Sequence, residues 1–136
     1  MGYTVACFDL DDCLIHEGFA TAIICEDTKT ILDYLKNLKS VDVKIALASH
    51  NEEALPILQE LGISTYFDIV LGYYDESNKV SHLHKIAKAL NVGASQIVFY
   101  DDVQVNIAAT REHGFKGFLV NYVTGVKLEE VISRFK

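Results

Sequence analysis

The sequence predicts an α/β fold, in which helices cover both faces of a doubly wound, parallel, five-stranded sheet. Five short runs of β-favouring apolar residues alternate with segments whose apolar residues recur at helical spacing. Strands that alternate with helices in this way usually pair in parallel. Half of the 136 residues are hydrophobic and proline occurs only once, which indicates one folded domain over residues 1–136.

The expected strands lie at residues 3–8, 41–48, 66–71, 96–100 and 118–120. The first of them, YTVACF, is mostly apolar, as expected for a strand buried on both faces. After it, residues 14–25 predict a small hairpin or flap that leans over the end of this strand.

Helices are expected after residues that can cap them: Asp27 or Thr28, Asn51, and Ser77 or Asn78. Pro56 lies inside the second helix, which we expect it to bend or weaken. Gly62 and Gly114 stand where glycine commonly ends a helix. A last helix is expected to carry Leu128, Val131, Ile132 and Phe135.

Three carboxylates, Asp9, Asp11 and Asp12, follow the first strand directly. Clustered like charges repel and raise one another's pKa, so packing alone explains them poorly. A divalent cation with oxygen ligands is the simplest partner for them. An acidic strand exit without chemistry is the alternative that this stretch leaves open.

Other polar residues stand at the ends of the neighbouring strands. Ser49 follows the second strand and Asp101-Asp102 the fourth, while Lys79 begins the helix after the third. Parallel sheets bind ligands beyond the carboxyl ends of their strands, at the switch in strand order. The convergence of these residues on one edge favours a functional site.

Composition excludes several other functions. The formal net charge of −7 and the scattered basic residues argue against binding to nucleic acid or to an anionic membrane. No apolar run approaches the roughly 20 residues that span a bilayer, and no signal peptide is recognisable. The three cysteines lack Cys-x-x-Cys spacing, which argues against a disulfide framework or structural zinc. We therefore expect a cytoplasmic protein.

In order, the chain has Asp-x-Asp at 9–11, Ser49, Lys79 and Asp-Asp-x-x-x-Asn at 101–106. This order resembles the four motifs of the haloacid dehalogenase (HAD) superfamily, whose commonest members are magnesium-dependent phosphatases. The resemblance covers essentially the whole chain.

Within the superfamily, NKVSH at 78–82 and VFYDD at 98–102 are most similar to the small capless magnesium-dependent phosphatases of eukaryotes. Members that act on small metabolites usually carry an inserted cap domain. The segments 9–49 and 49–79 are too short to contain one.

The resemblance implies a magnesium-dependent phosphomonoester hydrolase. Asp9 would be the nucleophile that forms an aspartyl-phosphate, and Asp11 the general acid and then the general base. Mg²⁺ would be held by the carboxylates of Asp9 and Asp102 and by the backbone carbonyl of Asp11. Ser49 and Lys79 would bind the phosphoryl group.

Three further residues take supporting roles by the same resemblance. Asp101 would act behind the metal ligand, and Asn106 would orient metal-bound water. The backbone N–H of Leu10 would help to bind the phosphoryl anion, together with the N–H that follows it.

An open site without a cap suits a phosphorylated protein side chain but also accepts a phosphorylated small molecule such as a sugar phosphate. His50 and Asn51 are expected to contact the leaving group. The loop at 73–76 is expected to border the site and, through Asp75 and Glu76, to repel polyanions.

One departure from the family is Cys13, which stands where Thr or Val is usual. We expect reduced activity from it. A second hypothesis is that Cys13 makes the enzyme sensitive to oxidation, although the adjacent carboxylates should keep its thiolate fraction low.

Two other functions are considered. A receiver-type signalling module needs a phospho-accepting Asp at the end of a middle strand, whereas the second and third strands end at Ser49 and Leu71. A catalytically weak protein that binds phosphorylated partners would retain all of the expected residues, so activity must separate it from the enzyme.

Overall fold

The computed structural model describes residues 2–72 and 78–136; the expected border loop 73–76 and the cap Ser77 lie outside them. It confirms the five-stranded parallel sheet, whose strands lie in the order β5-β4-β1-β6-β7. In chain order the strands are β1 (Val5–Phe8), β4 (Lys44–Ala48), β5 (Ile69–Leu71), β6 (Ile97–Asp101) and β7 (Lys116–Leu119).

Strand β1 is the centre of the sheet. Its last residue, Phe8, pairs with Leu47 of β4 on one side and with Tyr100 of β6 on the other. The chain builds outward from β1 through β4 to β5 and then returns to place β6 on the opposite side of β1. The carboxyl end of β1 is therefore the switch point at which such sheets bind ligands.

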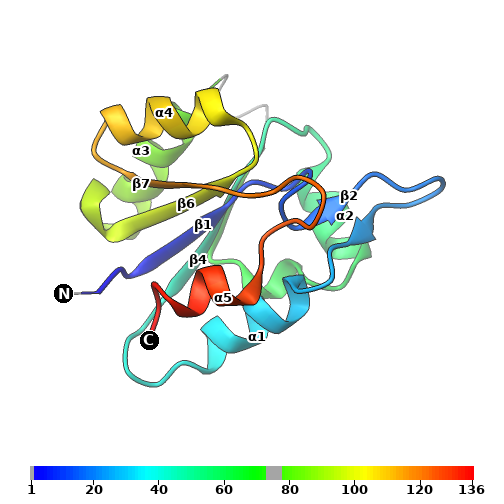
Figure 1. The fold of residues 1–136 in the computed structure, drawn as a ribbon, viewed down its shortest axis with the longest axis horizontal. Helices are drawn as coiled ribbons and strands as arrows, with labels where there is room; N and C mark the ends of the chain where they lie inside the picture. Colours follow the sequence, from blue (N-terminus) through cyan, green and yellow to red (C-terminus); the bar gives the residue numbers. More distant parts are fainter. Residues whose placement is uncertain (1, 73–77) are drawn as a thin grey trace.

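Among the described residues, five α-helices cover the two faces of the sheet (Figure 1). Helices α3 (Lys79–Leu90) and α4 (Gln104–Glu112) lie on one face, with α1 (Thr28–Asn37) and α5 (Leu128–Ile132) on the other. Helix α2 (Ala54–Glu60) contributes to the same core as α1. Successive residues of β1 belong to the two cores in turn, because strand side chains alternate between faces.

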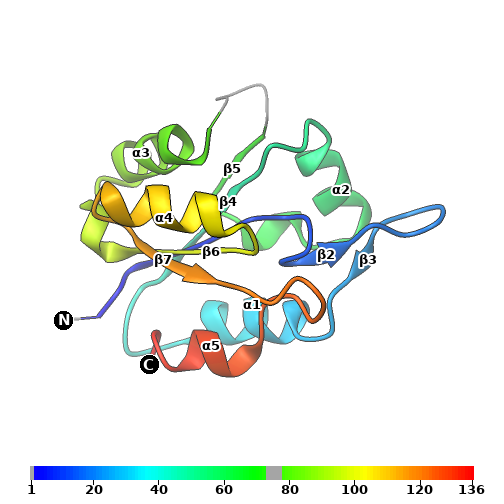
Figure 2. The same ribbon diagram turned by 45° about the horizontal axis from the view of Figure 1, so that its top comes forward.

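The flap is a two-stranded antiparallel hairpin of β2 (Ile15–His16) and β3 (Ile23–Ile24), as predicted. It projects away from the sheet beside α2 (Figure 2). Its turn requires Gly18, because a Cβ there would lie 1.9 Å from the backbone oxygen of Thr21. The segments between the strands contain no cap domain among the described residues.

The first helix has Asp27 at its N-cap position, as predicted, but lacks the side-chain cap hydrogen bond. Neither Asp27 nor Thr28 caps α1 through its side chain. The Thr28 hydroxyl donates to the Leu14 carbonyl at 2.6 Å, and Asp27 accepts from the Leu128 N–H at 2.8 Å. Contacts with distant segments thus take the groups that a local pattern assigns to the helix end.

Of the caps predicted for the next two helices, the one on α3 is confirmed and the one on α2 is wrong. Asn78 caps α3 by accepting from the Ser81 N–H at 2.8 Å. Asn51 does not cap α2, whose N-cap residue is Glu53; its Oδ1 accepts from the Glu53 N–H at 2.8 Å in the turn ahead of the helix. Pro56 is the third residue of α2, where a backbone N–H has no helical partner, so contrary to expectation it removes no helical hydrogen bond.

The last helix is shorter than expected. It ends at Ile132, and Phe135 is buried beyond it. Gly62 and Gly114 both adopt positive φ directly after the C-cap residues of α2 and α4, as their positions predicted. No helix in the described part of the chain has the length and apolar character needed to cross a bilayer.

Candidate active site

The ends of β1, β4 and β6 meet at an open hollow of about 420 Å³. Backbone hydrogen bonds continue past the ends of β1 and β4. The Asp9 N–H donates to the Tyr100 carbonyl at 2.9 Å, and the Ser49 N–H donates to the Leu71 carbonyl at 2.9 Å. These bonds fix Asp9 and Ser49 at the edge of the sheet. Most of the predicted site residues line the hollow: Asp9, Asp11, Ser49, His50, Asn51, Lys79, Asp102 and Asn106.

Lys79 connects two of the strand ends from the first turn of α3. Its Nζ lies 2.8 Å from Asp9 Oδ1 and 3.2 Å from Asp101 Oδ2. The side chains of these three residues are 3%, 11% and 0% exposed. Burial opposes the charge on Lys79, but the two carboxylates outweigh it and raise its pKa. Lys79 is therefore a buried cation.

Asp101 is held by three donors. Its Oδ2 accepts from Lys79 and, at 2.9 Å, from the Asn106 amide, while its Oδ1 accepts from the Val103 N–H at 3.1 Å. Both oxygens of this fully buried carboxylate are thus used within the protein. Asp101 ties Lys79 and the start of α4 to the end of β6.

Asp9, Asp101 and Asp102 each offer a carboxylate oxygen, and these atoms all lie within 4.8 Å of one another. Three carboxylates thus face the single ammonium of Lys79. Burial raises the pKa of Asp9 to about 8, against the attraction of Lys79 and helped by the repulsion of Asp101. Burial and the carboxyl group of Asp101 raise the pKa of Asp102 to about 6.

When all three carboxyl groups are ionised, the one ammonium beside them does not balance their negative charge. A hard divalent cation with oxygen ligands would balance it, so the donor set fits Mg²⁺. The family resemblance implied carboxylate ligands from Asp9 and Asp102. The structure brings the carboxylate of Asp101 into the same cluster, which was not expected. The carboxylate of Asp11 lies outside it.

Asp11 lies just beyond β1, in a tight turn. The Leu10 carbonyl accepts from the N–H groups of Leu14 at 3.0 Å and Ile15 at 3.2 Å. Asp12, the next residue, has a left-handed backbone with φ of 58°. The turn leaves the Asp11 side chain exposed at the rim while Leu10 itself is fully buried. Any contribution of Leu10 to the hollow comes from its backbone.

Asn51 joins the loop after β4 to Asp11. Its Nδ2 donates to Asp11 Oδ2 at 3.2 Å, and its N–H donates to Ser49 Oγ at 3.0 Å. Ser49 accepts in that bond, which leaves its hydroxyl proton to be donated to a ligand. The sequence predicted Asn51 as a helix cap and as a leaving-group contact, but not as a partner of Asp11. The link to Asp11 joins two loops, and local sequence carries no signal for it.

His50 is exposed at the rim, and its ring centroid lies 5.8 Å from that of His82. Partial burial and the charge of Lys79 lower the pKa of His50. Asp12, which the sequence grouped with Asp9 and Asp11 around a cation, also lines the hollow but lies outside the carboxylate cluster; its Oδ1 is 2.9 Å from His16 Nδ1. The four-residue spacing of this pair is a weak signal outside a helix.

Cys13 is fully buried behind the site, with its thiol directed at the Tyr100 carbonyl at 3.6 Å. Burial and the nearby Asp9 carboxylate raise the pKa of Cys13 well above its ordinary value. A buried, protonated thiol reacts slowly with oxidants, which argues against the oxidation hypothesis.

Comparison with known proteins agrees with this architecture. The acid phosphatase family model matches residues 16–136. The match begins after the first acidic motif. The assignment of Asp9 and Asp11 to the site is therefore supported by the geometry and by the motif resemblance, and not by the family match. No curated protein matches the chain significantly.

Several solved structures share the fold. A haloacid dehalogenase-like hydrolase from Bacteroides fragilis superposes with a TM-score of 0.76 at 15% identity, covering 97% of this chain and 93% of its own. A HAD-superfamily hydrolase of subfamily IA from Geobacter sulfurreducens gives 0.75 at 13%, with 88% and 90% coverage. The N-terminal part of another Bacteroides fragilis protein, containing a phosphatase domain complexed with Mg, gives 0.74 at 18%, with 99% and 41% coverage.

At these identities the solved structures establish the fold, and the family match establishes the relationship over most of the chain. Sheet order, the position of the site and the absence of an inserted cap among the described residues are consistent with both. The chain belongs to the acid phosphatase family, and it shares its fold with hydrolases of the haloacid dehalogenase superfamily.

Proposed function

We propose that the protein is a magnesium-dependent phosphomonoester hydrolase that works through an aspartyl-phosphate on Asp9. The observation that carries the proposal is the buried ammonium of Lys79, 2.8 Å from Asp9 and 3.2 Å from Asp101, beside the half-buried Asp102. A nucleophilic carboxylate, a fixed cation and a further acidic ligand are what in-line attack on a phosphate ester needs.

The carboxylates of Asp9 and Asp102, with the backbone carbonyl of Asp11, would hold Mg²⁺. When bound, the ion neutralises the negative charge of the nucleophile and of the phosphoryl oxygens. Asp101 stays in place through its bonds to Lys79 and Asn106, so it keeps the ammonium aimed at Asp9.

The chain's own residues then divide the reaction into two displacements. In the first, an oxygen of Asp9 forms a bond to phosphorus, the bond to the leaving oxygen breaks, and Asp11 gives that oxygen a proton. In the second, Asp11 takes a proton from water, the water oxygen attacks phosphorus, and Asp9 departs as a free carboxylate. Ser49 and Lys79 bind the phosphoryl oxygens throughout.

The substrate of this reaction is a phosphorylated small molecule or a phosphorylated protein side chain. The open shape of the hollow supports both classes, because no cap closes over it among the described residues.

The three cysteines are free thiols, which supports a cytoplasmic location.

Hydrolysis of p-nitrophenyl phosphate tests the proposal. We expect turnover in Mg²⁺, none in EDTA, and none from Asp9→Asn in either condition. Asp33→Asn, on the distant helix α1, should behave as wild type. Wild-type protein that binds phosphate but releases none from the ester would instead indicate a phospho-ligand-binding module.

A further inference from the structure

A second hollow adjoins the first. It has a volume of about 580 Å³ and lies between the hairpin β2–β3 and helix α2, elements that are neighbours in Figure 2. We call it the leaving-group groove. Its sides are formed mainly by Ile15, Glu17 and Ala22 of the hairpin segment and by Glu53, Ile57 and Glu60 of the α2 segment.

Asp11 and Asn51 line both hollows. In the proposed reaction Asp11 donates its proton to the leaving oxygen, so that oxygen must lie beside the Asp11 carboxylate. The phosphoryl group occupies the hollow that holds Asp9 and Lys79. The remainder of the substrate then extends past Asp11, into the groove. This step rests on the proposed function.

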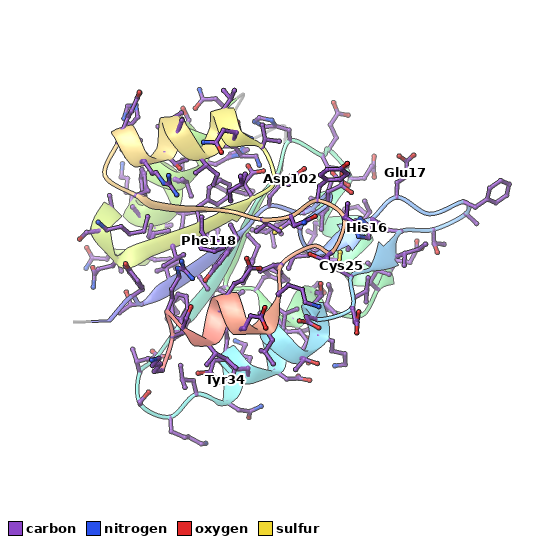
Figure 3. The ribbon with its side chains drawn as sticks, in the orientation of Figure 1. His16, Glu17, Cys25, Tyr34, Asp102 and Phe118 are labelled. Carbon is purple, nitrogen blue, oxygen red and sulfur yellow. The ribbon has the colours of Figure 1, made fainter. Side chains whose placement is uncertain are left out.

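The groove is negatively charged. Glu17, Glu53 and Glu60 are exposed along it, and Asp11 lies where it meets the first hollow. No Lys, Arg or His is among the described residues that line it. Figure 3 shows that the Glu17 side chain extends from the hairpin segment, farther from the sheet than Asp102, which follows the end of β6.

Apolar surface accompanies these charges. Ile15 is buried at the base of the groove, and Ile57 lies half-buried on α2. Lys and Arg side chains combine an apolar stem with a cationic head, so one such side chain matches both surfaces. The volume of the groove lies within the range of about 300–1,000 Å³ that is typical of ligand pockets. It is larger than a small amine such as the ethanolamine part of phosphoethanolamine would fill.

The hairpin also exposes Phe19 and Ile23, at 109% and 57% of their full accessible surface. Neither side chain lines the groove, but both belong to the hairpin that forms one of its sides, where they can contact a substrate longer than one residue. We propose that the leaving-group groove selects phosphopeptides that carry Lys or Arg next to the phosphorylated side chain.

Two phosphotyrosine peptides that differ only in the residue after phosphotyrosine, Lys or Glu, test this proposal. We expect wild-type kcat/KM to favour the Lys peptide by about tenfold, and the ratio to fall as ionic strength rises. The triple variant Glu17→Gln, Glu53→Gln, Glu60→Gln should bring the ratio close to one. Glu112→Gln, an exposed change on α4 outside the groove, should keep the wild-type ratio.

A charge reversal sharpens the result. The double variant Glu53→Lys, Glu60→Lys should prefer the Glu peptide. Equal hydrolysis of both peptides by the wild type, while p-nitrophenyl phosphate is turned over, would overturn the inference and leave the proposed function intact. The inference would also be overturned if the wild type preferred phosphoethanolamine over neutral alkyl phosphates but did not discriminate between the two peptides. Failure to hydrolyse p-nitrophenyl phosphate would contradict the proposed function itself.

Discussion

Lys79 depends on its neighbours for its charge. Its side chain is 3% exposed, and the carboxylates of Asp9 and Asp101 offset the loss of water around the ammonium, which also lies 5.3 Å from the centre of the Phe99 ring. The sequence predicted that Lys79 reaches the rim, because it begins the helix after a strand that ends there. It did not predict that Asp101 would share the ammonium, because that contact joins segments 22 residues apart.

Replacing Lys79 tests this dependence. Lys79→Met keeps the length of the side chain but leaves Asp9 and Asp101 buried without their cation. We expect at least a hundredfold loss of kcat and a loss of about 3–5 kcal/mol in the free energy of unfolding. Turnover of p-nitrophenyl phosphate and urea denaturation measure the two effects. Lys88→Met, on an exposed position of the same helix, is the control; an equal effect of both changes would contradict the account.

Asn51 provides a second test at the residue scale, because it holds Asp11 at 3.2 Å. We expect Asn51→Ala to lower kcat for an alkyl phosphate by about tenfold, since the leaving alkoxide needs a well-placed acid. p-Nitrophenolate leaves without a proton, so the loss with p-nitrophenyl phosphate should be smaller. An identical loss with both esters would argue that Asn51 acts on folding or phosphate binding instead.

At the scale of elements, Asp27 shows how two helix starts are joined. Its carboxylate accepts from the Leu128 N–H at the start of α5, 2.8 Å away, and lies 3.3 Å from the Lys127 ammonium. The hydrogen bond from Leu128 is the main reason that the pKa of Asp27 is lowered. The sequence made Asp27 a candidate cap of α1, because the competing partner lies 101 residues further along the chain.

The lowered pKa gives a direction for the dependence of stability on pH. A carboxyl group whose pKa is lower in the folded state adds stability above its unfolded pKa of about 3.9 and loses it as pH falls through the folded value. We expect Asp27→Asn to cost about 1 kcal/mol at pH 7 and progressively less below pH of about 4.

Urea denaturation of both proteins across this pH range measures the difference. Asp42→Asn removes a much more exposed carboxylate, with a side chain that is 88% exposed, and should change stability little at any pH. A difference between wild type and Asp27→Asn that stays constant down to pH of about 2 would contradict the assignment.

Across the whole molecule, the parts that follow from periodicity were predictable and the parts that follow from distant contacts were not. Alternating strands and helices implied a parallel sheet, and parallel strands bring Asp9, Ser49 and Asp101 to one edge because their carboxyl ends meet there. The hydroxyl of Thr28 bonds to Leu14 and leaves the helix end uncapped, which no local pattern indicates. The leaving-group groove likewise arises only when the hairpin packs beside α2.

The charge balance of the whole site predicts how metal affects stability. Because Asp9, Asp101 and Asp102 face one ammonium, Mg²⁺ should bind the folded state and raise the melting temperature by a few degrees. Asp102→Asn removes one repelling carboxylate, so we expect a higher melting temperature than wild type in EDTA and little further rise with Mg²⁺. Thermal melts in EDTA and in Mg²⁺ measure both. A full Mg²⁺ response in Asp102→Asn would exclude Asp102 as a ligand.

The central claim is that Asp9 becomes phosphorylated, and mass spectrometry of an acid-quenched reaction tests it most directly. Asp11→Asn retains the nucleophile but lacks the base that activates water, so the intermediate should accumulate during turnover of p-nitrophenyl phosphate in Mg²⁺. We predict one phosphoryl group on the peptide that contains Asp9, and none when Asp9→Asn is combined with Asp11→Asn. Phosphate released in Mg²⁺ by the Asp9→Asn single variant at the wild-type rate, or a phosphoryl group on any other residue, would contradict the account.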